Sequence, residues 1–186
     1  MGASPIMADD PIEVCEITGI SDCLVINMGT LKQNIVRSML LAGKKANELG
    51  HVVLLDPVGA GASKLRTNTA NELMEKVKFD VVRGNISEVK TLMLGTGSTK
   101  GVDADVADAV TEENLPQSIE FVKAFARASH AVAAVTGAID LVSDGEKCFV
   151  IRNGRPEMGK ITGTGCQLSG LMTAFLVANP EGPLEA

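Results

Sequence analysis

Short apolar runs alternate with longer helical patterns along most of this sequence. The apolar runs predict strands at residues 23–27, 52–55, 80–83 and 131–136. The helical patterns between them fall at residues 31–49, 69–77, 86–94 and 117–129. Strands that alternate with helices in this way form a mostly parallel sheet, which helices cover on both faces. The predicted fold class is therefore α/β.

Turn and cap signals complete the predicted fold. The expected helix caps are Asp9 or Asp10 for a short helix at residues 11–16, Thr30 for the helix at residues 31–49, and Gly50 at its end. Apolar runs at residues 141–143 and 148–151 flank Asp144-Gly145, which predicts a late antiparallel hairpin. Residues 95–113 are rich in Gly, Thr, Ser and Asp and are expected to form a long loop. With 186 residues, 45% of them hydrophobic, the chain is expected to form a single domain, residues 1–186.

The composition argues against several classes of function. A formal net charge of −6 and 3% aromatic residues leave no basic or stacking surface for nucleic acid. No apolar run approaches the roughly 18–20 residues that cross a bilayer, and the N-terminus lacks a signal-peptide pattern. The four cysteines are widely spaced with no Cys-x-x-Cys pair, which argues against a disulfide framework or a zinc site. We therefore expect a cytoplasmic protein with no nucleic-acid or membrane partner.

Polar side chains follow the predicted strands where each strand ends. They are Asn27, Asp56, Arg83, Asn85 and Thr136. The carboxyl ends of parallel strands meet at one edge of a sheet, and open α/β sheets bind their ligands at that edge. These residues are therefore candidates for a binding site.

A glycine-rich turn runs directly into an apolar helix at residues 160–168. Gly163 and Gly165 allow close approach of the backbone, and the unpaired N–H groups of a helix start stabilise a phosphate or a developing anion. Cys166 falls in the first turn, where the helix dipole favours a thiolate that acts as base or nucleophile. The alternatives are a simple connection for the turn and a small buried hydrophobe for Cys166.

Other glycine patterns fail the requirements of phosphate-binding motifs. Residues 154–160 have the Gly-x4-Gly-Lys spacing of a phosphate loop, but Ile161 stands where a hydroxyl must bind magnesium. The Gly-x-Gly pairs lack the third glycine of the dinucleotide fingerprint. His51 and His130 have no neighbours at metal-ligand spacing and are interpreted as surface or helix-end residues.

The segment at residues 85–88 has two interpretations. Asn85 and Glu88 match a capping box at a helix start, or they are a pair that serves a metal-bound phosphate. The second interpretation gains support from Asp56 and Arg83, which are expected at the same sheet edge. Carboxylates for magnesium, an arginine for phosphate and an anion-binding helix start together make a phosphoryl-transfer site.

Six blocks of sequence, spread along nearly the whole chain, form a specific set. They are residues 2–7 (GASPIM), 27–31 (NMGTL), 56–62 (DPVGAGA), 83–85 (RGN) with Glu88, 135–137 (VTG) and 162–166 (TGTGC). Any one block is a weak match, whereas together and in this order they resemble the hydroxyethylthiazole kinase family of the ribokinase-like superfamily. The resemblance implies that ATP and Mg2+ are used to phosphorylate the hydroxyethyl group of 4-methyl-5-(2-hydroxyethyl)thiazole, in thiamine biosynthesis or salvage. It also implies a homotrimer with active sites between subunits.

The resemblance assigns roles to residues at matching positions. The implied binding residues are Met7 and Gly163 for the thiazole alcohol, Arg83, Thr136 and Asn85 for ATP, and Asp56 and Glu88 for Mg2+ and the phosphates. Cys166 stands where most ribokinase-like enzymes carry an aspartate base. The turn amides at Gly163 and Gly165 would hold the transferring phosphoryl group.

The family pattern also has elements before the first block and after the last helix, so we expect this domain to be incomplete at both ends relative to the family. Two alternatives follow. One is a catalytically inactive truncated remnant that oligomerises. The other is a different ribokinase-like enzyme of vitamin metabolism, although such enzymes normally have aspartate at the position of Cys166.

Overall fold

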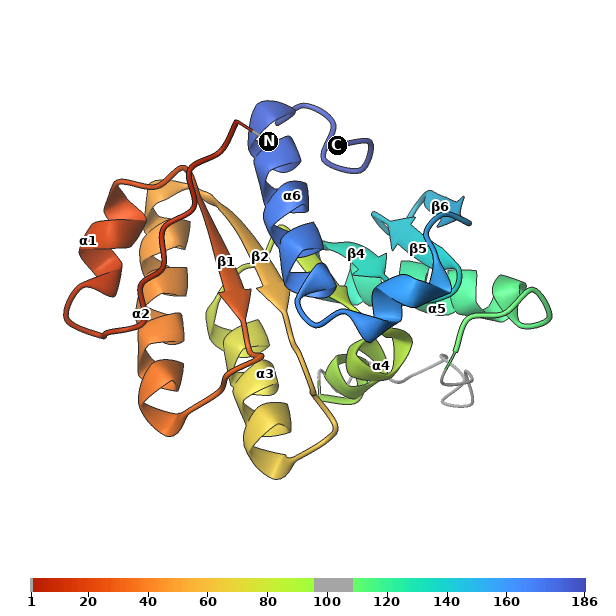
Figure 1. Cartoon of the computed structure of the whole chain (residues 1–186), viewed down its shortest axis with the longest axis horizontal. Helices are drawn as coiled ribbons and strands as arrows, with labels where there is room; N and C mark the ends of the chain where they lie inside the picture. Colours follow the sequence, from red (N-terminus) through yellow and green to blue (C-terminus); the bar gives the residue numbers. More distant parts are fainter. Residues whose placement is uncertain (1, 96–108) are drawn as a thin grey trace.

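The structure, a computed structural model, describes residues 2–95 and 109–186 (Figure 1). These residues form a six-stranded sheet with the strand order β1-β2-β3-β4-β5-β6. The strands are β1 (Cys23–Asn27), β2 (Val52–Asp56), β3 (Val81–Gly84), β4 (Val132–Val135), β5 (Asp140–Ser143) and β6 (Cys148–Ile151). Strands β1 to β4 are parallel, and β5 and β6 add an antiparallel hairpin. The predicted α/β class with a late hairpin is confirmed.

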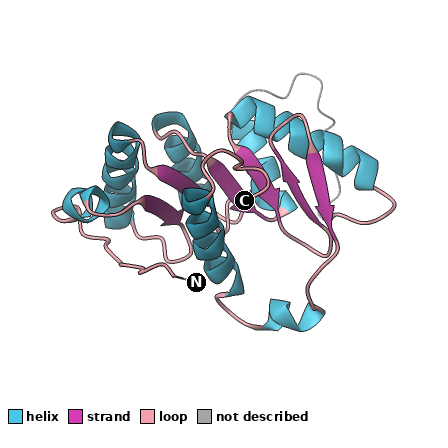
Figure 2. Ribbon diagram, turned by 90° about the horizontal axis from the view of Figure 1, so that it is seen from above, coloured by secondary structure: helices cyan, strands magenta, loops and turns pink. Residues whose placement is uncertain are grey.

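Helices cover both faces of the sheet, as predicted (Figure 2). They are α1 (Val14–Gly19), α2 (Gln33–Leu49), α3 (Lys64–Lys76), α4 (Ile86–Gly95), α5 (Leu115–Ser129) and α6 (Thr164–Ala178), together with a 3-10 helix, η1 (Pro156–Lys160). Val53 and Leu55 of β2 belong to the larger core, which α2 to α5 cover. Leu54 between them belongs to a second core with Leu176 of α6. Because successive strand side chains point to opposite faces, β2 supplies both cores.

The starts of three helices differ from the prediction. Residues 11–13 form a turn, so α1 begins at Val14 instead of at residue 11. Thr30 also lies in a turn, and the N-cap of α2 is Lys32. Helix α3 begins at residue 64, before the predicted residue 69, because the Ser63 hydroxyl accepts the Arg66 N–H at 3.3 Å. Caps depend on local backbone geometry, which the periodicity of apolar residues does not define.

Two predicted turns are confirmed. Gly50 ends α2 with a left-handed φ of 71°. In the hairpin, Asp144 Oδ1 accepts the N–H groups of Lys147 and Glu146, each at 2.8 Å. These bonds from Lys147 and Glu146 hold the pKa of the Asp144 carboxyl below its usual value. The charged form of Asp144 therefore supports the turn that joins β5 to β6.

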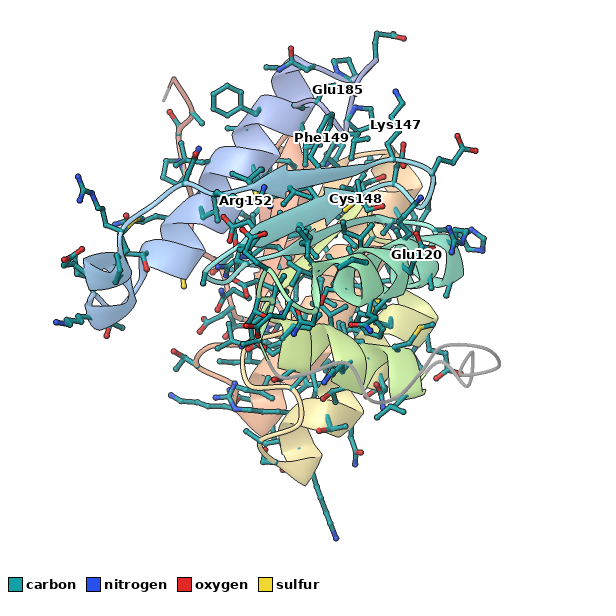
Figure 3. All side chains as sticks on the ribbon, turned by 90° about the vertical axis from the view of Figure 1, so that its right-hand side faces the viewer. Glu120, Lys147, Cys148, Phe149, Arg152 and Glu185 are labelled. Carbon is teal, nitrogen blue, oxygen red and sulfur yellow. The ribbon has the colours of Figure 1, made fainter. Side chains whose placement is uncertain are left out.

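Strand β6 is the outer strand of the hairpin, and its side chains point to both faces of the sheet (Figure 3). Cys148 packs against the larger core, and burial raises the pKa of its thiol. Phe149 instead lines a largely apolar cavity of about 420 Å³ between the sheet and α6. Thr136, which follows β4, and Met172 of α6 line the same cavity.

Residues 96–108, most of the loop predicted at residues 95–113, lie outside the described residues. Gly95 is the last residue of α4, and residues 109–113 lead into α5. Within residues 2–95 and 109–186, none of the helices combines the length and apolar character needed to span a membrane.

Candidate active site

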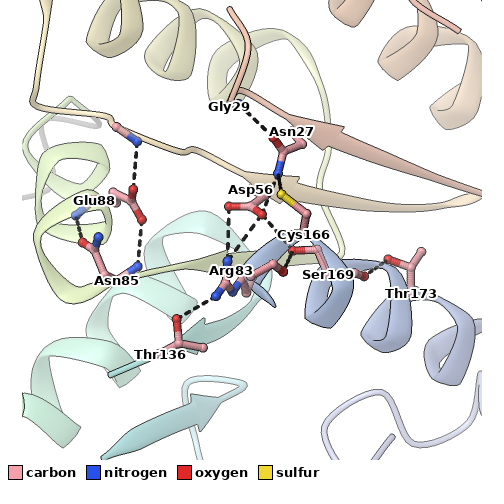
Figure 4. A network of polar contacts seen from close by, with 12 residues as sticks. Asn27, Gly29, Asp56, Arg83, Asn85, Glu88, Thr136, Cys166, Ser169 and Thr173 are labelled. Atoms are coloured by element: carbon pink, nitrogen blue, oxygen red, sulfur yellow. Dashed lines mark hydrogen bonds and ion pairs between the residues drawn. The ribbon is translucent and has the colours of Figure 1, made fainter. Parts of the chain in front are cut away.

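Asp56 is the centre of a polar cluster at the edge where the parallel strands end (Figure 4). It is the last residue of β2 and is only 1% exposed. Its Oδ2 accepts hydrogen bonds from Asn27 Nδ2 at 2.8 Å and from Ser169 Oγ at 2.9 Å. Arg83 Nη1 lies 3.4 Å from Oδ2 and 3.5 Å from Oδ1. Side chains from β1, β2, β3 and α6 therefore meet at one carboxylate.

Arg83 is held between the sheet and the start of α6. Its Nη2 donates to Thr136 Oγ1 at 3.0 Å. A Cβ atom at Gly165 would lie 2.7 Å from Nη1, so glycine is needed there to make room for the guanidinium. The side chain is 14% exposed, and its buried Nε has no hydrogen-bond partner within the described residues. Because one N–H is unpaired and the contacts to Asp56 are long, the guanidinium is able to bind an anion such as phosphate.

The first turn of α6 presents amides that no side chain caps. Gly163 is the N-cap, with a left-handed φ of 97°. Apart from its two neighbours in the chain, no described residue has an atom within 4 Å of the position that a Cβ at Gly163 would take. An uncapped helix start with open space beside it meets the requirements of an anion site. It lies next to Arg83, so two sources of positive potential meet at one place.

Cys166 differs from the other cysteines of the chain because it is exposed. Its Sγ lies 3.4 Å from Asn27 Nδ2, within the polar cluster. Burial raises the pKa of the Cys23 and Cys148 thiols, which disfavours their thiolates. The alternative interpretation of Cys166 as a small buried hydrophobe is therefore wrong.

Asn85 and Glu88 form a reciprocal capping box at the start of α4. Asn85 Oδ1 accepts the Glu88 N–H at 2.9 Å, and Glu88 Oε2 accepts the Asn85 N–H at 2.8 Å. Glu88 Oε1 also accepts the Gly59 N–H at 2.8 Å, which ties α4 to the loop after β2. Of the two interpretations of this segment, the structure shows capping. The role with a metal-bound phosphate stays a prediction.

The carboxylates suit a magnesium ion that is shared with substrate phosphates. Within the described ranges, no three His, Cys, Asp or Glu side chains gather as metal ligands. In the part of the chain that the structure describes, Asp56 Oδ1 has only the long contact with Arg83, and each Glu88 oxygen keeps a second lone pair beside its backbone donor. Magnesium in kinase sites is bound by one or two carboxylates together with waters and substrate phosphates. Each carboxylate thus keeps oxygen lone pairs that could serve Mg2+, and the magnesium role of Asp56 and Glu88 stays a prediction.

The sequence model of the hydroxyethylthiazole kinase family matches residues 1–186. The chain belongs to this family. Relatives named hydroxyethylthiazole kinase from Clostridium acetobutylicum and Clostridium beijerinckii are 59% and 48% identical to it, over 185 and 182 residues. These matches cover 100% and 97% of this chain, but 68% and 65% of the relatives.

A solved structure of a hydroxyethylthiazole kinase protein from Pyrococcus horikoshii OT3 has the same fold, with a TM-score of 0.81 and 38% sequence identity. The superposition covers 95% of this chain and 63% of that one. The chain thus spans about two thirds of the length of the family members it matches.

Met7, the predicted thiazole contact, is left almost fully uncovered by the single chain. It lies in the segment before α1, and it is 94% exposed. The structure places the remaining predicted residues on the ends of β1 to β4, in the loops that follow them, at the start of α4 and at the start of α6. The thiazole contact of Met7 stays a prediction.

Two residues in or near the polar cluster were not predicted from the sequence to be part of the site. Ser169 is a serine inside an apolar helix, yet its hydroxyl reaches Asp56. Arg66 of α3 donates to the carbonyl oxygens of Met28 and Val58, and through Nη2 to that of Gly29 at 3.0 Å. Arg66 thereby ties together the loops that follow β1 and β2. The signal for Ser169 was the polar interruption of the apolar run, three residues after Cys166.

Gly165→Ala is expected to weaken the binding of MgATP about tenfold, because the new methyl group would displace Arg83. The measurement is calorimetric titration with MgATP. Gly170→Ala is the matched control: it lies in the same helix, and outside that helix no described residue comes within 4 Å of the new Cβ, so the change should stabilise the fold by about 1 kcal/mol. Equal nucleotide affinities for the two variants would show that Arg83 does not depend on the glycine.

Glu88→Gln is expected to lower the free energy of unfolding by about 1–2 kcal/mol, since an amide group would face a backbone N–H that now has a carboxylate acceptor. Urea unfolding measures this. A Glu88 that served only a metal would show no such loss. The charge-matched control is Glu75→Gln on the exposed side of α3, which should change stability by less than about 0.5 kcal/mol.

Proposed function

We propose that the chain transfers the γ-phosphoryl group of ATP to the hydroxyl of 4-methyl-5-(2-hydroxyethyl)thiazole, in thiamine biosynthesis or salvage. The observation that supports this most is the meeting of Arg83, Asp56 and the uncapped start of α6 at one sheet edge, in a member of the hydroxyethylthiazole kinase family. Phosphoryl transfer depends mainly on positioning and on electrostatic stabilisation. An arginine and a helix start that lie beside each other can position the phosphoryl group and stabilise its negative charge.

In this proposal Cys166 accepts the proton of the substrate hydroxyl. The hydroxyl oxygen forms a bond to the γ-phosphorus while the bond between that phosphorus and the β–γ bridging oxygen breaks, and ADP leaves. The amides at Gly163 and Gly165 stabilise the negative charge on the transferring group. Asn27 Nδ2, at 3.4 Å from Sγ, orients the sulfur.

The nucleotide is proposed to bind along Arg83, Asn85 and Thr136. The cavity of about 420 Å³ beside Thr136 has the size and the apolar lining that suit a nucleoside base. Mg2+ would be held by Asp56 and Glu88 together with the phosphates, and when bound it supplies charge neutralisation on the β- and γ-oxygens. The cytoplasmic location expected from the sequence stays a prediction.

We further propose a homotrimer in which Met7 and Gly163 contact the thiazole alcohol at a subunit boundary. Exposed apolar side chains on either side of α1 support an interface there, because Met7, Ile12 and Ile20 are 94%, 87% and 79% exposed. Light scattering should give three times the mass of one chain. A stable monomer would contradict both the trimer and the proposed thiazole site between subunits.

The proposed reaction is tested by incubating the purified chain with MgATP and either the thiazole alcohol or the corresponding pyrimidine alcohol of thiamine, with mass spectrometry of the products. The expected result is a thiazole phosphate and ADP in equal amounts. Phosphorylation of the pyrimidine alone would favour another ribokinase-like enzyme. An oligomer that forms no product from either alcohol would be an inactive remnant.

A further inference from the structure

Helix α6 carries two buried hydroxyl groups on the face that packs on the sheet. Ser169 is 0% exposed and Thr173 is 1% exposed. The Thr173 hydroxyl donates to the Ser169 carbonyl oxygen at 2.7 Å, within the same helix. The Ser169 hydroxyl has the Gly165 carbonyl at 3.1 Å, but it also has Asp56 Oδ2 at 2.9 Å. Within residues 2–95 and 109–186, the Ser169 hydroxyl therefore reaches beyond its own helix and the Thr173 hydroxyl does not.

The Ser169 proton is expected to go to Asp56. A hydroxyl has one proton to donate, and a carboxylate is a stronger acceptor than a backbone carbonyl. Among the described residues, the Asp56 oxygens are then held unequally: Oδ2 receives close bonds from Asn27 and Ser169, whereas Oδ1 has only Arg83 at 3.5 Å. Two donors on one oxygen fix the rotation of the carboxylate about its terminal bond.

Asp56 in turn determines where the guanidinium of Arg83 lies. The pair is nearly buried, with side chains 14% and 1% exposed, so solvent screens it little. Nη1 lies against both Asp56 and Gly165, and Nη2 is bonded to Thr136. A carboxylate that rotated away would leave Arg83 without a partner on the side of α6.

We propose that Ser169 is a positioning residue for nucleotide binding: it orients Asp56, and Asp56 holds Arg83 beside the first turn of α6. This rests on the proposed function in one respect, which is that Arg83 binds the phosphates of ATP. Ser169 lies one turn after Gly165 and Cys166, so the same bond fixes the start of α6 against the end of β2. Loss of the hydroxyl should therefore weaken MgATP binding without direct contact to the nucleotide.

The test compares Ser169→Ala with Thr173→Val, which also removes a buried hydroxyl from α6 but one that bonds only to its own helix. Calorimetric titration with MgATP in the absence of thiazole should show about tenfold weaker binding for Ser169→Ala, the loss expected for one hydrogen bond to a charged group. Thr173→Val should bind within about twofold of the unchanged chain. Ser169→Thr keeps the hydroxyl and should restore most of the affinity. In turnover assays, Ser169→Ala should raise KM for MgATP and leave KM for the thiazole alcohol unchanged.

A second measurement tests the contact without any ligand. In urea unfolding, Ser169→Ala combined with Asp56→Asn should deviate from additivity by about fivefold in the unfolding equilibrium constant, whereas Thr173→Val combined with Asp56→Asn should be additive. Additivity in both cycles would overturn the inference.

The outcomes also separate this inference from the proposed function. If the unchanged chain binds MgATP and Ser169→Ala binds equally well, the positioning role is wrong and the proposed reaction is untouched. If Ser169→Ala binds more weakly but no thiazole phosphate forms in either chain, the positioning role stands and the proposed substrate is wrong. If the unchanged chain binds no MgATP, both are overturned.

Discussion

Replacing Cys166 with alanine is expected to lower the turnover number about 10²- to 10⁴-fold, the usual contribution of a base within hydrogen-bond reach. The sulfur lies in the first turn of α6 and within 3.4 Å of Asn27 Nδ2, whereas the amides that would stabilise the phosphoryl group belong to the backbone. Alanine removes the proton acceptor and leaves those amides in place. KM for MgATP should therefore change by less than about threefold. Steady-state kinetics on the refolded or native chain measure both quantities.

Cys166→Asp and Cys15→Ala are the controls for that result. The aspartate restores the base that ribokinase-like enzymes usually carry, and because the position is exposed the fold should tolerate the charge. Cys15 is a half-buried thiol of α1, and its loss should leave turnover unchanged. Full turnover in Cys166→Ala, together with loss of folding in Cys166→Asp, would show that the turn amides carry the chemistry without a base.

Asp56→Ala has the second large expected effect, a decrease of about 3 kcal/mol in the free energy of unfolding. The substitution leaves the guanidinium of Arg83 without its carboxylate, and it also removes the acceptor of Asn27 and Ser169. The estimate is at the lower end for a broken buried pair because the Arg83 side chain is still 14% exposed. Urea unfolding monitored by far-UV circular dichroism gives the value, and MgATP binding should be lost in the same variant.

Asp140→Ala is the control for this measurement, because it also removes an aspartate carboxylate but one outside the polar cluster of Asp56. Asp140 begins β5, and its Oδ1 accepts one N–H, from Gly137 at 2.8 Å. Its removal should cost about 1 kcal/mol, the typical value of one hydrogen bond. Equal losses for the two variants would mean that the Asp56 cluster contributes no more than a surface turn.

Much of the fold follows from local sequence, and the reason is physical. Strands β1 to β4 are short apolar runs, and the predicted strand at residues 23–27 coincides with β1. Alternation with helices then requires parallel pairing, which brings the ends of β1, β2 and β3 to one edge. The meeting of Asn27, Asp56 and Arg83 could therefore be predicted without coordinates.

The remaining features depend on contacts that no local pattern records. The Ser169 bond to Asp56 joins residues 113 positions apart. Most serines inside helices donate to a backbone carbonyl of the same helix, and the sequence does not show which serine bonds to another element instead. Glu88 matched two patterns in sequence, and its bonds to the N–H groups of Asn85 and Gly59 show how its carboxylate is used. The exposure of Cys166 likewise follows from how α6 sits on the sheet.

The central claim is that the strand ends and the start of α6 form one phosphate-binding site. Amide hydrogen exchange measured with and without MgATP tests it most directly, since exchange slows where ligand binding protects backbone N–H groups. The predicted result is slower exchange at residues 163–167 and 83–86, with no change along α1. Unchanged exchange at residues 163–167, in a chain that calorimetry shows to bind MgATP, would place the nucleotide elsewhere and contradict the account.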